Sequence, residues 1–450
     1  MEKSNNEKLI EAVIKGDKIS FNKLFDNSKE SVIQDKEGNS LIHLASVNGQ
    51  LELLKVLLES KANIMIKNKN EDIPIHLAAS KGNSKIVSCL LDHQIETLEA
   101  RNKYGETPLL VAVVHGNVDV VHCLIEYNSN IKKRDTKGNN VFHLACSYGH
   151  LELVDFFAER NKNLMKVQNS WEDTPFLSAI ENNQEKIVKR MLELGYKLNK
   201  TDKQKAVHVG AVKGNLQILE MLIGLGLNLE LKNRKGDTPL NVACFFGKTD
   251  IVRRLIDQGV STALQPDEYG RNHIHKLCEK GKTEILDCFY TDSHEDLNLQ
   301  DTFGQTPLHV AIARRHFEIT KRFIELGVDL EKKDTSGNTP LLSAITHNQM
   351  DIVKLLIEHK ADITAINAEK NTIAHLAVTT PNTKLVELIF SYNEDKDPVN
   401  IYGYTPLLWI LKFQPKLDMI ITLIQCQVNI FNIYEGGQSL LQHLLSNHWF

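Results

Sequence analysis

One short pattern of polar and apolar residues organises the chain, and residues 301–332 show it most clearly. A polar turn containing Gly304 precedes Thr306 and Pro307, which suit the N-cap and the first turn of a helix. Two apolar runs with helical spacing follow, and Gly327 ends the second one. The pattern predicts a turn, two short helices and an extended return.

This pattern recurs along almost the whole sequence at intervals of 31 to 34 residues. A fixed period of this length predicts a solenoid, in which each unit buries its apolar face against its neighbours. The positions that correspond to Thr306 are, in order, Glu7, Ser40, Ile73, Thr107, Asn140, Thr174, Lys205, Thr238, Asn272, Thr306, Thr339, Thr372, Thr405 and Ser439.

The period, the TPLH core at residues 306–309 and the recurring glycines together resemble the ankyrin repeat. The resemblance extends from about Glu7 to Phe450. It implies an all-α solenoid of helix-turn-helix units with short β-hairpin fingers, and about 12 full repeats plus partial terminal units. Ankyrin arrays serve many processes, so the resemblance is specific for fold and says little about function.

The ends and the irregular repeats carry further expectations. We expect residues 1–34 to form an N-terminal capping helix pair and residues 35–450 to form the array, whose last unit is incomplete at Phe450. We favour a longer native protein over an incomplete cap as the reason. The repeat at Lys205 is short and has no glycine in its turn, which predicts a shortened finger. The substitution of Arg315, Asn348, Pro381 and Gln414 for the recurrent glycine predicts turns of differing geometry.

Composition narrows the functional classes. The 53 Lys and Arg nearly balance the 57 Asp and Glu, so no global basic field favours nucleic acid or a membrane surface. No apolar stretch approaches the ~18 residues of a membrane helix, and the N-terminus lacks the apolar segment of a signal peptide. The seven cysteines are scattered without a CxxC pair, which is typical of buried thiols in a reducing compartment. We therefore expect a cytoplasmic protein, with the nucleus as the alternative.

Histidines recur at the fourth position of the core motif, and a ladder of metal ligands is one interpretation. Successive repeats lie roughly 10 Å apart, too far for two of these rings to share one zinc ion. The ankyrin resemblance instead implies that each ring binds the backbone of the adjoining turn. These residues are His43, His76, His143, His208, His275, His309 and His375.

No nucleophile elbow, phosphate-binding loop or metalloprotease motif occurs in the sequence, so we expect neither catalysis nor a cofactor. Aromatic residues at positions that the resemblance places on the finger tips and first-helix ends are more informative, because aromatics and arginines anchor protein interfaces. The alternatives are aromatic rings that pack on the neighbouring finger and a solvated face of mixed charge. The predicted partner-binding residues are Tyr148, Trp171, Phe245, Phe246, Tyr269, Arg271, Phe303 and Arg314, and the tips also carry Tyr104, Tyr402 and Tyr404.

These observations favour a monomeric scaffold or adaptor that binds a protein partner through the concave face of the array. One alternative is the targeting arm of a larger protein, with an enzymatic or membrane-binding module beyond residue 450. The other is phosphoinositide or nucleic-acid binding through basic residues of the repeats from Thr238 to Thr306, which a steep loss of binding with salt would reveal.

Overall fold

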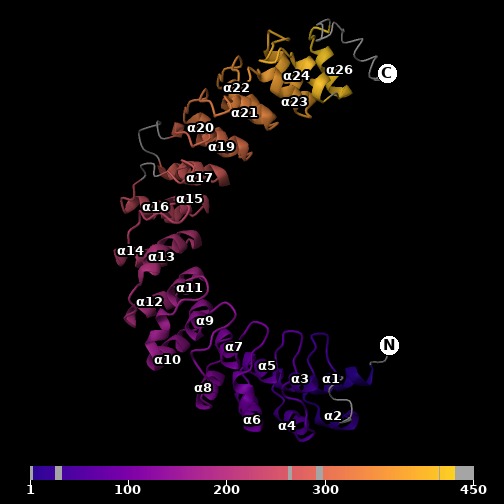
Figure 1. Cartoon of the computed structure of the whole chain (residues 1–450), viewed down its shortest axis with the longest axis vertical. Coiled ribbons are helices and arrows are strands. Elements are labelled where there is room, and N and C mark those ends of the chain that lie inside the picture. Colours follow the sequence, from indigo (N-terminus) through magenta and orange to yellow (C-terminus); the bar gives the residue numbers. More distant parts are fainter. Residues whose placement is uncertain (1–3, 26–32, 262–265, 290–296, 415, 431–450) are drawn as a thin grey trace. The chain divides into compact units, whose positions relative to one another are not determined.

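The computed structural model describes residues 4–25, 33–261, 266–289, 297–414 and 416–430. By its contacts the chain divides into two compact units, Met1–Asn228 and Leu229–Phe450. In each unit, first and second helices alternate along the sequence and lie in two layers (Figure 1). The expected boundary at residue 34 and the continuity of one array over residues 35–450 stay predictions.

In unit 1, the first helices pack in succession, α1 on α3 through to α11 on α13. The first helices are α1 Asn5–Lys15, α3 Leu41–Val47, α5 Pro74–Ser80, α7 Pro108–Val114, α9 Val141–Tyr148, α11 Pro175–Glu181 and α13 Lys200–Lys213. The second helices are α2 Lys18–Leu24, α4 Leu51–Glu59, α6 Ser84–His93, α8 Val118–Glu126, α10 Leu151–Asn161, α12 Glu185–Glu193 and α14 Leu216–Gly224, with short 3-10 turns η2 Ile95–Glu99 and η3 Lys162–Lys166.

Unit 2 repeats this arrangement, with α15 packed on α17 and so on to α25. Its first helices are α15 Pro239–Phe245, α17 His273–Lys280, α19 Pro307–Ala313, α21 Pro340–Thr346, α23 Ile373–Thr379 and α25 Pro406–Phe413. Its second helices are α16 Thr249–Asp257, α18 Thr283–Leu286, α20 Phe317–Glu325, α22 Met350–Glu358, α24 Thr383–Tyr392 and α26 Leu417–Gln425, with the 3-10 turn η4 Asp287–Phe289 after α18.

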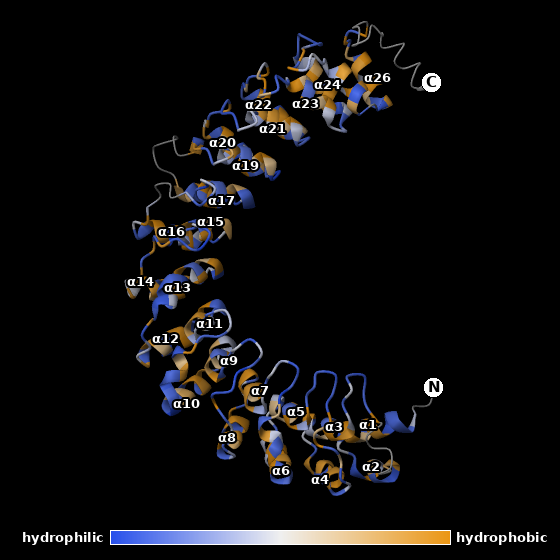
Figure 2. Cartoon of the chain, viewed as in Figure 1, coloured by the Kyte–Doolittle hydropathy of each residue, from blue (hydrophilic) through white to orange (hydrophobic). Residues whose placement is uncertain are grey.

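The first helices begin as the sequence pattern predicts. In α19, the Thr306 hydroxyl accepts a hydrogen bond from the N–H of His309, and Pro307 occupies the first turn, where its missing N–H costs nothing. The apolar residues of the two helices face each other and the neighbouring repeats, whereas the fingers are hydrophilic (Figure 2). The chain is thus all-α over the described residues.

The fingers are tight turns rather than strand pairs. Among the described residues, strand-like pairing is limited to one isolated bridge between Gln34 and Ser40. A finger such as residues 102–106 closes on itself through Asn102 N to Glu106 O at 3.1 Å, which leaves no room for a ladder. The backbones of neighbouring fingers are joined instead by isolated hydrogen bonds, for example from Thr136 N to Tyr104 O at 2.9 Å.

The expectation of a shortened finger at Lys205 was wrong, because helix α13 takes its place. Asn199 caps this helix, with its side-chain oxygen 2.8 Å from the N–H of Asp202. Residues 200–209 contain no glycine or proline that would favour a turn, so the helix continues into the core motif. The fully buried Asp202 carboxylate accepts hydrogen bonds from the hydroxyls of Thr174 at 2.5 Å and Tyr196 at 2.7 Å.

The later turns between first and second helices do not all share one geometry, as expected. Arg315 and Asn348 adopt the same left-handed conformation as the glycines at this position in earlier repeats, with φ of 62° and 53°. At the next two turns the geometry changes: Thr380, just before Pro381, is extended with φ of −84° and ψ of 157°, and Gln414 has φ of −149° and ψ of 63°. Proline cannot continue the pattern of the earlier turns, so the predicted irregular turn at Pro381 is confirmed. The predicted irregular turn at Pro415 and the incomplete last unit in residues 431–450 lie outside the described residues.

Candidate functional site

One asparagine or aspartate closes each finger and thereby fixes the residue at its tip; we call it the finger-closing residue. Asn102 Oδ1 accepts hydrogen bonds from the N–H groups of Tyr104 and Glu106, both at 3.0 Å. Asp267 does the same for Tyr269 and Arg271, at 2.8 and 2.9 Å. The tip side chains Tyr104 and Tyr269 therefore stand on rigid turns rather than on loose loops.

The histidine row binds fingers to helices. In six of the seven recurrent histidines, Nε2 lies 2.8–3.1 Å from a backbone carbonyl oxygen at the next finger, and for His76 from two such oxygens. Burial lowers the pKa of these rings, to about 4 in His143, so they are neutral at physiological pH. Their predicted structural role is confirmed for His43, His76, His143, His275, His309 and His375.

We call the surface formed by finger tips and first-helix ends the finger face. In unit 1 it contains a groove of about 380 Å³. The tips contribute Tyr104 and Trp171, and the end of α9 contributes Tyr148. The exposed fractions of these residues are 50%, 56% and 54%, so each of them is accessible to a partner.

Acidic residues outnumber basic ones among the side chains that line this groove. Glu106, Asp135 and Glu181 carry carboxylates, and Lys137 carries the one ammonium group. The Lys137 Nζ lies 6.0 Å from the centre of the Trp171 ring. No Lys, Arg or His among the described residues lies within ion-pair distance of the three carboxylates. The groove therefore combines aromatic faces with uncompensated negative charge.

In unit 2 the finger face carries a second aromatic group. Phe245 and Phe246 meet edge to face, with ring centres 5.2 Å apart. Lys280 Nζ lies 4.5 Å over the Phe245 ring, whereas Phe246 is 48% exposed. Of this pair, Phe246 is the more exposed residue. The tip residues Tyr269 and Phe303, exposed by 43% and 54%, follow on the next two fingers.

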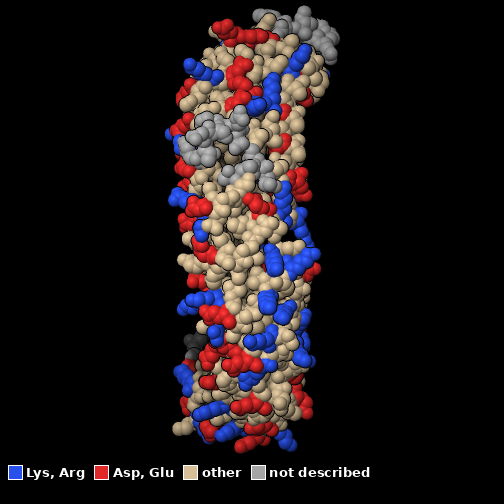
Figure 3. Space-filling model, turned by 90° about the vertical axis from the view of Figure 1, so that its left-hand side faces the viewer, with Lys and Arg blue, Asp and Glu red and all other residues tan. Residues whose placement is uncertain are grey.

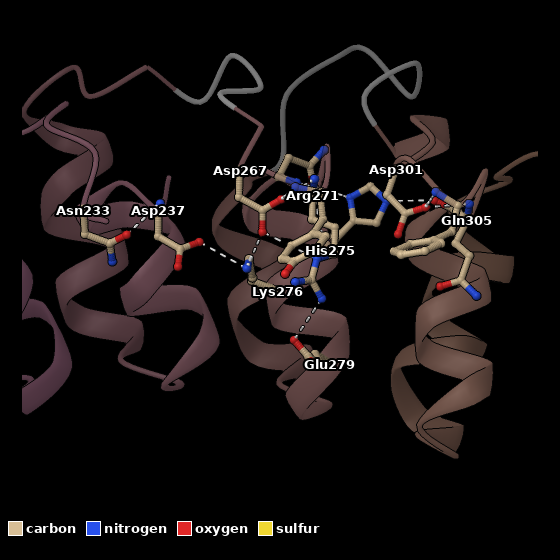
Figure 4. Close-up of polar contacts among 12 residues, drawn as sticks. Asn233, Asp237, Asp267, Arg271, His275, Lys276, Glu279, Asp301 and Gln305 are labelled. Atoms are coloured by element: carbon tan, nitrogen blue, oxygen red, sulfur yellow. Dashed lines mark hydrogen bonds and ion pairs between the residues drawn. The ribbon is translucent and has the colours of Figure 1, made fainter. Parts of the chain in front are cut away.

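Charged side chains beside these aromatics are paired within the unit (Figure 4). Arg314 Nη2 lies 2.7 Å from Glu279 Oε1, and Arg271 Nη1 lies 3.8 Å from Glu279 Oε2. The Arg271 guanidinium also lies 4.9 Å from the Tyr269 ring centre. The two arginines share one carboxylate, which reduces the positive charge that they offer to a ligand.

Beneath them, Lys276 joins two aspartates (Figure 4). Its Nζ is 2.6 Å from Asp267 Oδ2 and 3.1 Å from Asp237 Oδ1. The side chains of Lys276 and Asp267 are only 10% and 1% exposed. Most other repeats have an apolar residue at the corresponding position, such as Leu144 and Val310, so this buried ammonium is a local addition to the repeat framework.

A model of a protein family, ankyrin repeats in three copies, matches residues 42–135, 124–202, 207–290 and 274–367. These segments span most of the chain. The chain belongs to the ankyrin-repeat family. The count of about 12 ankyrin repeats stays a prediction from the period of the sequence.

Individual ankyrin-containing relatives match parts of the chain. The nuclear factor NF-kappa-B p105 subunit of Gallus gallus is 25% identical over 206 residues, 44% of this chain and 21% of that protein. A homologue of transient receptor potential cation channel subfamily A member 1 from Caenorhabditis elegans is 25% identical over 194 residues, 42% of this chain and 16% of that protein. The ankyrin repeat domain of Bcl-3, a solved structure, is 26% identical and covers 49% of this chain and 97% of that chain, with a TM-score of 0.44. The chain thus spans about a fifth of the first two relatives.

The structure brings some predicted residues of this ankyrin chain together and leaves others apart. Tyr148 and Trp171 line one groove in unit 1. In unit 2, Phe245 contacts Phe246, and Arg271 and Arg314 meet at Glu279. The exposed Phe303 ring has no ring contact with the other predicted residues. Whether any of them binds a partner stays a prediction.

The sequence analysis missed the acidic side of the groove and the buried Lys276. Glu106, Asp135 and Lys276 occupy recurrent positions of the repeat, so an alignment of the repeats with one another would have isolated them as charges. The bridge from Lys276 to Asp237 could not be found in this way, because Asp237 belongs to the preceding repeat.

Three further observations concern charge, membrane spans and metal sites. On the face drawn in Figure 3, acidic and basic side chains are interspersed in both units. Over the part of the chain that the structure describes, no helix combines the length and the apolar character that crossing a bilayer requires. Within the same residues, His, Cys, Asp and Glu side chains form no group of three that could hold a metal ion.

Proposed function

We propose that this ankyrin chain is a non-catalytic scaffold or adaptor that binds a protein partner through its finger face. Ankyrin repeats are protein-interaction domains, and the proposal adds which surface is used. The observation that carries it is the groove of unit 1, in which Tyr104, Tyr148 and Trp171 are each at least half exposed. Aromatic side chains held on rigid turns lose little conformational entropy on binding, which suits them as anchors.

The test is affinity capture with the intact chain and its variants. Tyr148→Ala with Trp171→Ala should remove the partner that the native chain captures, because each true anchor contributes about 2 kcal/mol or more. Tyr392→Ala is the matched control, since this residue is 42% exposed on the second helix α24, away from the finger tips. Normal capture by a folded double variant would refute binding at this groove.

The alternative functions expected from the sequence differ in how far the structure supports them. A larger protein that uses this chain as a targeting arm is compatible with the same surface, and the long relatives support it as an alternative. Anion binding at the repeats from Thr238 to Thr306 has less support, because Arg271 and Arg314 share Glu279. We propose that the chain resides in the cytoplasm or nucleus, a proposal that its seven free cysteines support, and imaging of the tagged chain tests it. We also propose that it is a monomer, which light scattering tests.

A further inference from the structure

Neighbouring fingers touch through two recurrent positions. One is the finger-closing residue, and the other is the last residue of the preceding finger, which we call the finger-end residue. In four of the fingers that an asparagine closes, its amide donates to the finger-end residue before it. Asn102 Nδ2 lies 2.9 Å from Asp72 Oδ1, and Asn169 Nδ2 lies 3.0 Å from Asn139 Oδ1. The pair is thus a donor facing an acceptor.

At two places both positions are acidic, so that neither can donate. In unit 2, Asp267 closes the finger after Asp237, and Lys276 supplies the missing donor as a buried ammonium group. This ammonium group bridges the two carboxylates and compensates their negative charge.

In unit 1 the corresponding residues are Glu106 and Asp135, and both line the groove. The residue that corresponds to Lys276 is Leu144, which also lines the groove and carries no charge. Glu106 and Asp135 receive hydrogen bonds from the neutral amides of Asn102 and Asn139, at 3.0 and 2.9 Å. Amide donors leave the charge of a carboxylate in place, so this acidic pair lacks the cation that its counterpart in unit 2 has.

From this comparison we propose that the groove of unit 1 takes a cationic side chain, Lys or Arg, from an extended segment of the protein partner. The inference rests on the proposed function and adds the chemistry of the anchor. The cation reaches Glu106 and Asp135, and the aromatic rings of Tyr104, Tyr148 and Trp171 line its path.

The shape and the walls of the groove fit this occupant. A volume of about 380 Å³ accommodates one long side chain with its flanking backbone, and is at the small end of ligand pockets. An aromatic face attracts a cation most strongly when water is excluded, and Trp does so best. Glu181 at the end of α11 provides a further carboxylate for the flanking residues, whereas Lys137 at the finger tip disfavours a second positive charge beside Trp171.

The first experiment measures which side chain the intact chain prefers. The probes are short fluorescent peptide pools, uncharged except at a central residue fixed as Lys, Arg, citrulline or Glu, and the readout is fluorescence polarisation. The Lys or Arg pool should bind about tenfold or more tightly than the citrulline pool. Citrulline keeps the shape of arginine without its charge. Equal binding of all four pools, or preference for Glu, would overturn the proposal.

The second experiment places the cation. Asp135→Asn keeps the finger closed, as asparagine does at Asn102 and Asn169, and should reduce binding of the cationic pool to that of the citrulline pool. Leu144→Lys should have the same effect, because it supplies the cation from within the chain. Glu185→Gln, an exposed residue on α12 outside the groove, is the control and should bind normally. Circular dichroism verifies that each variant is folded; Asp135→Asn protein that is folded and still prefers cationic pools contradicts the assignment.

A third readout separates this inference from the proposed function. In chain labelled with 5-fluorotryptophan, the 19F signal assigned to Trp171 by Trp171→Phe should shift with the cationic pool. If that signal is unmoved while the Tyr148→Ala and Trp171→Ala variant still loses its captured partner, the groove binds a protein through some other chemistry and only this inference falls. If partner capture is also normal in the variant, the proposed function falls at this groove as well.

Discussion

The buried Lys276 offers a direct test of how neighbouring repeats are matched. We expect Lys276→Val to destabilise the fold by about 3 kcal/mol. Valine is the residue that Val242 and Val310 provide at the same position of their repeats, so the helix itself tolerates it. The loss is electrostatic, because the substitution removes the ammonium group that lies between the carboxylates of Asp237 and Asp267.

The magnitude follows from the geometry. At about 3 Å and an effective dielectric constant of about 20, each ion pair is worth roughly 5 kcal/mol in Coulomb terms, most of which offsets the cost of burying the ions. Removal of one partner from a buried pair costs about 3–5 kcal/mol. We take the lower end of this range because Asp267 keeps two other kinds of contact. It accepts backbone hydrogen bonds at 2.8 and 2.9 Å, and Arg271 Nε lies 3.5 Å from its carboxylate. Burial opposes ionisation of Asp267, but the hydrogen bond from Lys276 and the backbone N–H groups lower its pKa.

A second substitution should restore most of the loss. Asp267→Asn keeps the finger closed and adds an amide that can donate to Asp237, as Asn102 donates to Asp72 at 2.9 Å. The double variant Asp267→Asn with Lys276→Val should therefore lie within about 1 kcal/mol of the native chain, with a coupling energy of about 2 kcal/mol in the double-mutant cycle.

The assay is urea unfolding of the intact chain followed by circular dichroism, with hydrogen exchange of the α17 amides as the local readout. Local exchange matters because a repeat array can open unit by unit. Lys321→Val is the control, since this lysine side chain is 49% exposed, and should change stability by less than about 0.5 kcal/mol. The reasoning is refuted if Lys276→Val costs no more than this control, or if the two substitutions in unit 2 simply add.

Three further outcomes are expected. Changing Phe246, Tyr269 and Phe303 together to Ala should leave the fold intact, because all three rings are 43–54% exposed, and should reduce partner capture; an unfolded variant would show that they are packing residues. Burial lowers the pKa of His273 from 6.5 to about 3, so its contribution to stability is full above pH 6.5 and is lost as the pH falls toward 3, and His273→Ile should flatten that dependence in acid unfolding curves. Arg315→Gly should raise the free energy of unfolding by about 0.5–1 kcal/mol, because φ is 62°; a lower melting temperature would contradict this, and would point to the Arg315 bond to the His347 carbonyl oxygen at 2.8 Å.

The sequence was sufficient for the features of the fold that depend on local chemistry. Thr306 and Pro307 begin α19, and the histidine row contacts the next finger, as the motif and the ankyrin resemblance predict. The α13 region was not predictable in this way. The finger was expected from its place in the repeat, whereas the local residues from Asn199 favour a helix, and the local preference prevailed.

The candidate site was only partly predictable. The exposure of a side chain follows from its position within one repeat, whereas its ion pairs depend on residues of neighbouring repeats. Tyr148, Trp171 and Phe246 were placed on the finger face from their positions, and each is about half exposed. The basic residues Arg271 and Arg314 were also placed there, yet Glu279 lies between them. The positive charge that the two arginines offer to a ligand therefore depends on Glu279, which contacts arginines from two neighbouring repeats.

A charged residue of an ankyrin array must therefore be interpreted together with the residues of the neighbouring repeat that contact it. By itself, a lysine at the apolar position of Lys276 departs from the repeat pattern. It is explained by Asp237 and Asp267, because two acidic residues at those positions provide no hydrogen-bond donor between the fingers. Conversely, a leucine at position 144 is ordinary by itself, but beside Glu106 and Asp135 it leaves an acidic pair open on a groove. The unusual Lys276 and the ordinary Leu144 thus both stand beside a pair of acidic residues on neighbouring fingers. The difference is that one repeat neutralises its acids internally, whereas the other leaves them to be neutralised by whatever binds.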